Sequence, residues 1–167
     1  MGVCSSPRKG AIMNKAGPEN PHSQQKIEQA KKFIELELEP ERAFKAAVVT
    51  ESVAQGDARQ TSDIDMIVLF DPLRLDVIPG DFLWSPDARD FLTRHAKGRA
   101  HTENMVHFDT NRVALSDYKK GICPEFSRYL LSIGLLIFDR DGDVESVLDH
   151  LAEFTDVRRQ ERVAKNV

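Results

Sequence analysis

The sequence predicts an α+β domain in which apolar strands alternate with amphipathic helices. Residues 43–50 and 63–70 form two short runs, rich in valine, isoleucine and other apolar residues, that are typical of buried strands. Between residues 23 and 40, apolar side chains instead recur at helical spacing, at Ile27, Ala30, Ile34 and Leu38. Both patterns occur in one chain of 167 residues, which is long enough to bury a core of its own as one ordinary domain.

Five further elements are predicted along the chain. A helix is expected over residues 85–98, because a serine cap, a proline and an acidic residue begin it and a glycine ends it. Residues 101–109 are interpreted as a third strand, residues 124–134 as a helix between a proline and a glycine, and residues 135–138 as a short buried strand. A last helix is expected from residue 144 onward.

Composition and charge argue for a globular protein and against one that binds long nucleic acids or is held together by cysteines. The apolar fraction of 41% and the charged fraction of 30% are typical of a soluble globular protein. A formal net charge of −4 disfavours a partner that is a long nucleic acid. Cys4 and Cys123 lie far apart without metal-ligand spacing, so a reduced, cytoplasmic setting is the default expectation.

The two ends of the chain are expected to differ from its middle. Residues 1–25 contain prolines and glycines among polar residues and are interpreted as a flexible leader. Its first six residues fit a myristoylation pattern, but short N-terminal matches are common and no apolar run could span a membrane, so no membrane partner is expected. Residues 26–145 are expected to form the functional domain. Residues 146–167 are interpreted as a C-terminal helix, alone or as the start of a helical domain.

The functional signal is concentrated in one stretch before the second strand. Asp63 and Asp65 are two residues apart, and side chains at that spacing on a strand project to the same face. Two adjacent carboxylates need a counter-charge, and Mg²⁺ suits them because it takes oxygen ligands and keeps positions open for phosphates. Upstream, Ser52 and Gly56 lie in a small, polar segment whose backbone N–H groups could surround an anion.

At these residues the chain resembles the nucleotidyltransferase superfamily, the polymerase-beta-like fold in its minimal form. That family carries Gly-Ser, a ten-residue spacer and Asp-x-Asp; here Ser52 and Asp63-Ile-Asp65 keep the same ten-residue spacing. Ala54-Gln-Gly56 and Ser62-Asp-Ile-Asp also match the pattern. The resemblance covers residues 43–140 and implies a small mixed β-sheet flanked by helices. Glu51 departs from the pattern, because it occupies the place of the first glycine, where a carboxylate would repel a triphosphate.

The resemblance also implies a third carboxylate on the strand beside the Asp-x-Asp strand. Glu103 is the first candidate for it, as a metal ligand together with Asp63 and Asp65 and as the group that draws the proton from the attacking hydroxyl. Alternation along a strand places His107 and Asp109 on the same face as Glu103, so both remain alternatives.

The resemblance implies a Mg²⁺-dependent enzyme that transfers a nucleoside monophosphate, with AMP from ATP as the favoured case, to a hydroxyl of a small molecule or a protein. Ser52 and Gly56 would bind the β- and γ-phosphates, and Arg59 would supply a cation to them. The alternative is a catalytically weakened, antitoxin-like binding module in which Glu51 has closed the triphosphate site. Homo- or hetero-oligomers are compatible with either function.

Overall fold

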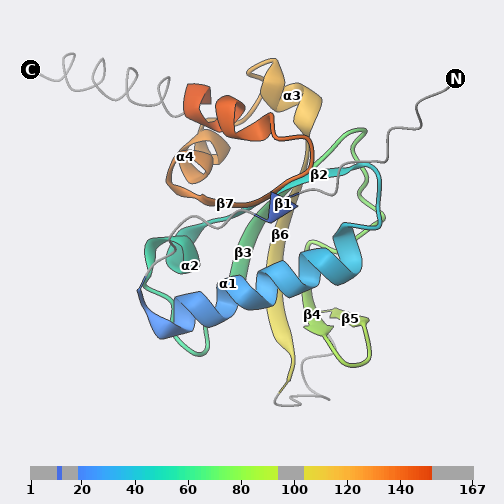
Figure 1. Ribbon diagram of the computed structural model, residues 1–167, viewed down its shortest axis with the longest axis vertical. Helices are drawn as coiled ribbons and strands as arrows, with labels where there is room; N and C mark the ends of the chain where they lie inside the picture. The colour runs from blue at the N-terminus through green and yellow to red at the C-terminus, as the bar shows by residue number, and fades with distance from the viewer. Residues whose placement is uncertain (1–10, 13–18, 94–103, 152–167) are drawn as a thin grey trace, which may run out of the picture.

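A seven-stranded mixed sheet with helices on both faces forms the centre of the protein in a computed structural model that describes residues 11–12, 19–93 and 104–151 (Figure 1). The parallel pair is β3 with β6, and the other neighbouring strands run antiparallel. The expected α+β class with a mixed sheet flanked by helices is therefore confirmed. Across the sheet, the strands are β1 (Ala11–Ile12), β7 (Leu135–Asp139), β2 (Phe44–Val49), β3 (Ile64–Phe70), β6 (Val106–Ala114), β4 (Asp81–Ser85) and β5 (Asp90–Thr93).

The helices form two layers, one on each face of the sheet (Figure 1). One layer contains α1 (Pro21–Phe33), which continues into the π-helix η1 (Ile34–Leu38) and packs beside the short α2 (Glu51–Gln55). The other layer contains α3 (Leu115–Lys119), α4 (Glu125–Ile133) and helical residues 144–151. No helix among the described residues is long and apolar enough to cross a membrane.

Aromatic side chains dominate the core between α1 and the sheet. Phe33 of α1 lies between the rings of Phe108, at a centroid distance of 4.5 Å, and Trp84, at 5.2 Å. All three side chains are fully buried. Burial on this scale is the main source of stability in a domain of this size.

Alternation along β3 divides its side chains between the two layers. Ile64 and Met66 belong to the core under α1, whereas Ile67 and Leu69 belong to the core under α3 and α4. Asp65 has the same parity as Ile67 and therefore projects to the face that carries α3 and α4. The start of β3 thus presents a carboxylate where the rest of the strand presents apolar side chains.

The first helix begins earlier than expected. Asn20 is its N-cap, and the Asn20 side chain accepts hydrogen bonds from the backbone N–H groups of His22 at 2.9 Å and Ser23 at 3.3 Å. Pro21 occupies the first helical position, which suits its missing N–H. Part of the expected leader therefore forms α1, and Ala11–Ile12 pairs with β7.

The prediction of a helix over residues 85–98 is wrong for residues 85–93, the part of that range that the structure describes. Residues 81–93 instead form a hairpin of β4 and β5, and the predicted cap residue Ser85 closes its turn by accepting a hydrogen bond from the Ala88 N–H at 3.3 Å. Arg89 adopts a φ of 56°, which reverses the chain, and Phe91 then packs 5.2 Å from the ring of Phe82. A serine hydroxyl can accept a backbone hydrogen bond in a tight turn as well as at a helix start. Here the packing of Phe91 against the aromatic core favours the hairpin.

The other expected elements that lie in the described ranges agree more closely with the structure. The strands predicted at 43–50, 63–70 and 135–138, the helix at 124–134 and a helix from residue 144 are confirmed within one or two residues at each described end. The third strand was expected over residues 101–109, but β6 begins at Val106 and extends to Ala114. Residues 101–103 and 152–167 lie outside the described part of the chain.

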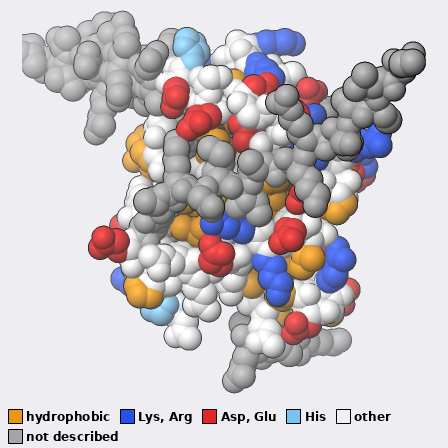
Figure 2. Space-filling model, viewed as in Figure 1, with side chains coloured by type: hydrophobic (Ala, Val, Ile, Leu, Met, Phe, Trp, Pro, Cys, Tyr) orange, Lys and Arg blue, Asp and Glu red, His pale blue; other side chains and the backbone are white. Residues whose placement is uncertain are grey.

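Acidic and basic side chains are interspersed on the described part of the face shown in Figure 2.

Candidate metal site

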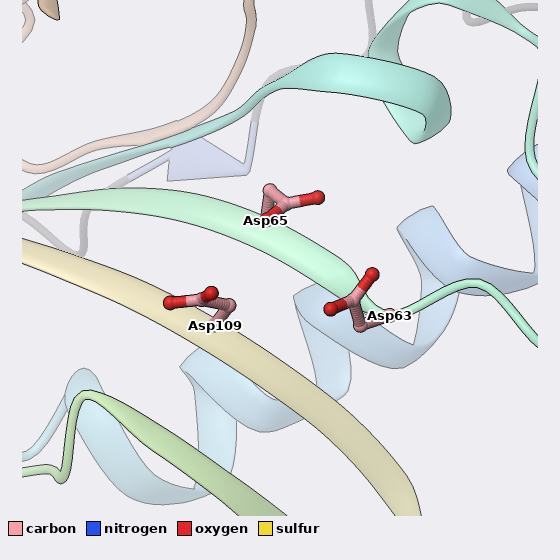
Figure 3. Close-up of side chains that lie close together, drawn as sticks. All are labelled: Asp63, Asp65 and Asp109. Atoms are coloured by element: carbon pink, nitrogen blue, oxygen red, sulfur yellow. The ribbon is translucent and has the colours of Figure 1, made fainter.

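Three aspartates, two of them on the neighbouring strands β3 and β6, converge at the start of β3 (Figure 3). Asp63 precedes β3, Asp65 lies on it, and Asp109 lies directly opposite Asp65 on β6. One carboxylate oxygen from each residue can be chosen so that all three lie within 4.8 Å of one another. The parallel register of β3 and β6 therefore brings together groups 44 residues apart in the sequence.

Backbone pairing holds this cluster close to the end of β2. The Thr50 N–H donates to the Asp65 carbonyl at 2.9 Å, which fixes the last residue before α2 beside the first acidic residue of β3. Glu51, the next residue, begins α2. The connection from β2 to β3 therefore begins and ends next to the three aspartates.

The electrostatics of the cluster are unfavourable without a cation. Burial and the negative charges of Asp63, Glu51 and Asp109 raise the pKa of Asp65 from 3.8 to about 7. Partial burial contributes most to this shift, and the neighbouring carboxylates add to it. A bound cation would remove the penalty for ionising Asp65, because it replaces repulsion with attraction.

The donors and their spacing fit a hard divalent cation. Three carboxylates supply only oxygen, which Mg²⁺ and Ca²⁺ prefer to nitrogen or sulfur. Oxygens on opposite sides of a Mg²⁺ ion lie about 4.2 Å apart. Adjacent oxygens around the ion lie about 3.0 Å apart. The aspartate oxygens, which all lie within 4.8 Å of one another, are near enough to converge on one ion. Asp109 is exposed and the other two are partly exposed, so a cation could enter from solvent.

A histidine flanks the cluster on the side of β4. The ring of His107 lies between two acids: its Nε2 is 2.7 Å from Asp81 Oδ1, and its Nδ1 is 3.9 Å from Asp63 Oδ2. Because His107 precedes Asp109 by two residues on β6, both side chains project to the same face. The alternation expected for this strand is thus confirmed for His107 and Asp109.

The third carboxylate that the structure places in the cluster is Asp109. The first candidate, Glu103, lies outside the described residues. Asp109 was an alternative because alternation alone does not fix how β6 aligns with β3. Only the register that pairs Asp65 with Asp109 and Ile64 with Phe108 identifies it.

The three residues expected to bind the nucleotide lie on or after α2. Ser52 is partly buried in its first turn. Gly56 ends α2 with a φ of 83°, and its N–H donates to backbone carbonyls of that helix, so its conformation serves the helix end. Arg59 is exposed, and its backbone N–H donates to the Ser62 hydroxyl at 2.9 Å.

Glu51, which occupies the place of the motif glycine, adopts a φ of 54°. This left-handed conformation is ordinary for glycine and costs other residues about 1–2 kcal/mol. The backbone at this position thus has the geometry that a glycine would favour, although a glutamate is present. Its side chain is exposed, and its charge contributes to the raised pKa of Asp65.

Comparison with known proteins finds no family whose model matches this chain and no curated protein that matches it. The geometry and charge of the site therefore carry the functional proposal.

Proposed function

We propose that this protein has a nucleotidyltransferase fold and is a Mg²⁺-dependent enzyme that transfers a nucleoside monophosphate, with AMP from ATP as the favoured case, to a hydroxyl of a small molecule or a protein. The observation that carries the proposal is the cluster of Asp63, just before β3, with Asp65 and Asp109, which pair across β3 and β6. The cluster adjoins the segment that begins with Glu51 and Ser52, so the proposed metal and phosphate sites would share one end of the sheet.

Each residue of the cluster has a distinct proposed role. Asp63 and Asp65 would hold Mg²⁺, which supplies positive charge to the triphosphate and to the leaving pyrophosphate. The acceptor hydroxyl oxygen forms a bond to the α-phosphorus while the bond from that phosphorus to the bridging oxygen breaks. Pyrophosphate leaves with the electron pair. Asp109, the most exposed of the three, would complete the cation site or take the hydroxyl proton.

Calorimetry with ATP and Mg²⁺ tests the nucleotide site directly. The natural chain is expected to bind ATP only when Mg²⁺ is present, and the Asp63→Asn, Asp65→Asn double variant is expected to lose that binding. A matched control is Asp57→Asn, which neutralises an exposed aspartate of the same loop. If the natural chain binds no Mg·ATP, or if the double variant binds it equally well, the proposed function is wrong.

A second function, a nucleotidyltransferase-fold binding module without activity, is favoured by Glu51. Its carboxylate adds negative charge beside Asp65, whose pKa it helps to raise, and would repel a triphosphate bound there. Two substitutions separate charge from backbone geometry: Glu51→Gln removes the charge alone, and Glu51→Gly also relieves the left-handed backbone. A large gain in Mg·ATP affinity in both variants would favour the weakened module. Unchanged affinity in both would remove its main support.

A further inference from the structure

A histidine at the edge of the aspartate cluster is held in place by a carboxylate. His107 lies on β6 and Asp81 begins β4, and the Nε2 atom of His107 is 2.7 Å from Asp81 Oδ1. An ionised carboxylate only accepts hydrogen bonds, so Nε2 carries a hydrogen and donates it. This contact fixes the orientation of the imidazole ring and the position of one of its hydrogens.

The strand registers place this pair on the same face of the sheet as the cluster. Asp109 is directly opposite Asp65 on β3 and directly opposite Asp81 on β4, so three neighbouring strands carry carboxylates in one row. His107 precedes Asp109 by two residues and shares its face. His107 and Asp81 therefore extend the candidate metal site toward β4.

The other ring nitrogen of His107 faces a member of the cluster. Its Nδ1 atom is 3.9 Å from Asp63 Oδ2, which is too far for a hydrogen bond. A water molecule that donates to both atoms would hold them about 4.5 Å apart. Two ligands of one cation, with bonds of about 2.1 Å, lie from about 3.0 Å apart when adjacent to about 4.2 Å when opposite. The observed separation therefore suits two ligands of a single ion.

A histidine that donates from one nitrogen to a carboxylate has the usual form of an imidazole metal ligand. The carboxylate leaves the lone pair on the other nitrogen, holds the ring at a fixed angle and makes the ligand more basic. Asp81 is placed to do this for His107 through the contact at 2.7 Å. The imidazole is also mostly buried, with 22% of the side chain exposed, so few other orientations are open to it.

We infer that the cation bound by Asp63, Asp65 and Asp109 also takes Nδ1 of His107 as a ligand, so that the site favours a transition-metal ion such as Zn²⁺ over Mg²⁺. Three aspartates alone suit Mg²⁺, which prefers oxygen, whereas imidazole nitrogen is a good ligand for Zn²⁺. The inference rests on the proposed function, because it identifies the class of cation that the proposed nucleotide site would use.

Two other roles for His107 predict different results. A positively charged His107 that pairs with Asp81 and Asp63 would oppose any cation, so its removal would strengthen Zn²⁺ and Mg²⁺ binding alike. A purely structural link between β4 and β6 would contribute to stability and leave the ratio of the two affinities unchanged. A nitrogen ligand instead makes Zn²⁺ affinity fall on its removal while Mg²⁺ affinity changes little.

Calorimetry on the full chain with Zn²⁺ alone and with Mg²⁺ alone tests the inference. We expect His107→Asn to weaken Zn²⁺ binding about 100-fold and Mg²⁺ binding by less than about threefold. Asp81→Asn keeps a hydrogen-bond acceptor but removes the charge, so it should reduce the ratio of Zn²⁺ to Mg²⁺ affinity about tenfold. His150→Asn is the matched control, because it removes an exposed histidine and should change neither affinity.

Nitrogen NMR of the isotopically labelled histidines gives a second measurement that a structural role would not affect. In the natural chain, Zn²⁺ should shift the Nδ1 resonance of His107, which is identified by its absence from His107→Asn. Mg²⁺ should leave that resonance in place. A resonance that does not move at saturating Zn²⁺ would contradict the inference.

The outcomes separate this inference from the function on which it rests. Unchanged or tighter Zn²⁺ binding by His107→Asn would overturn the role of His107, while Mg·ATP binding by the natural chain would still support the nucleotide site. Zn²⁺ binding that depends on His107, in a chain that binds no Mg·ATP, would overturn the proposed function and leave the metal ligand. Failure of the natural chain to bind either cation would overturn both.

A second variant covers the case in which His107→Asn does not fold, as its circular dichroism would reveal. His107→Gln then replaces it, and undiminished Zn²⁺ binding by His107→Gln is equally contrary to the inference.

Discussion

The two faces of β3 and β6 differ sharply at adjacent residues. Ile64 pairs with Phe108 in the fully buried core, and the next pair, Asp65 with Asp109, forms part of the acidic cluster. The packed face gains stability from burial, whereas the acidic face loses some of it to repulsion. The same register of β3 and β6 thus sets both the apolar pair in the core and the acidic pair in the cluster. The packed core therefore positions the carboxylates.

The largest expected effect comes from breaking the packed face. Phe108→Ala should reduce the free energy of unfolding by about 4 kcal/mol, because it leaves a cavity among aromatic rings. Phe108 contacts Phe33 and Phe82 at centroid distances of 4.5 and 5.5 Å. Urea denaturation followed by fluorescence measures the change. Phe126→Ala is the matched control, since that side chain is 65% exposed and its loss should cost little. A similar loss in both variants would contradict the distinction.

The next effect concerns the acidic face and its pH dependence. With a pKa of about 7, Asp65 is largely protonated at pH 6 and ionised at pH 8 in the metal-free protein. Because the proton competes with the cation, Mg²⁺ affinity should fall about tenfold from pH 8 to pH 6. Calorimetry at both pH values measures it, and binding at pH 6 should release close to one proton. Equal affinity at the two pH values would show that Asp65 is not perturbed.

Removal of the repulsion should stabilise the metal-free protein. The pKa of Asp65 is higher in the folded state, about 7, than its ordinary value of 3.8, so folding favours the protonated carboxyl. The folded state therefore loses stability as the pH rises from about 4 to about 7. Asp65→Asn avoids this loss, and we expect it to be more stable than the natural chain by about 1 kcal/mol at pH 8. The advantage should shrink at pH 5 and disappear when saturating Mg²⁺ stabilises the natural chain alone.

The smallest effect concerns the backbone at the edge of the acidic face. Glu51→Gly relieves the left-handed conformation, worth about 1–2 kcal/mol, but it adds about 0.5–1 kcal/mol of entropy to the unfolded chain. A net gain of about 0.5 kcal/mol is expected in thermal or urea unfolding. Glu51→Ala removes the same carboxylate but keeps a Cβ at a φ of 54°, so it isolates the effect of charge. A Glu51→Gly protein no more stable than Glu51→Ala would argue against strain at this position.

Local patterns predicted most of the fold and two of the three clustered aspartates. The apolar runs of β2, β3 and β7 and the periodicity of α1 specify these elements through residues close in sequence. Asp63 and Asp65 were predictable for the same reason, because a spacing of two on a strand determines their common side. Alternation placed the candidates for the third carboxylate on one face of the strand but could not choose among them. The choice of Asp109 depends on how β6 aligns with β3, and that alignment is set by residues far apart in the sequence.

The hairpin of β4 and β5 illustrates the same limit. Ser85 accepts a backbone hydrogen bond in a turn as readily as at a helix start, so its local chemistry did not distinguish the two structures. Phe91 packs against Phe33 and Phe82 from different elements, and those contacts favour the strand.

The sequence by itself determined the α+β class, the strands that flank α2, and the adjacent pair Asp63 and Asp65, because each depends on spacing within a few residues. The tertiary structure decided that Asp109 joins them and that burial and three acidic neighbours raise the pKa of Asp65. Register and layer packing bring distant residues together through the burial of apolar surface, which is a property of the whole chain and of no single segment.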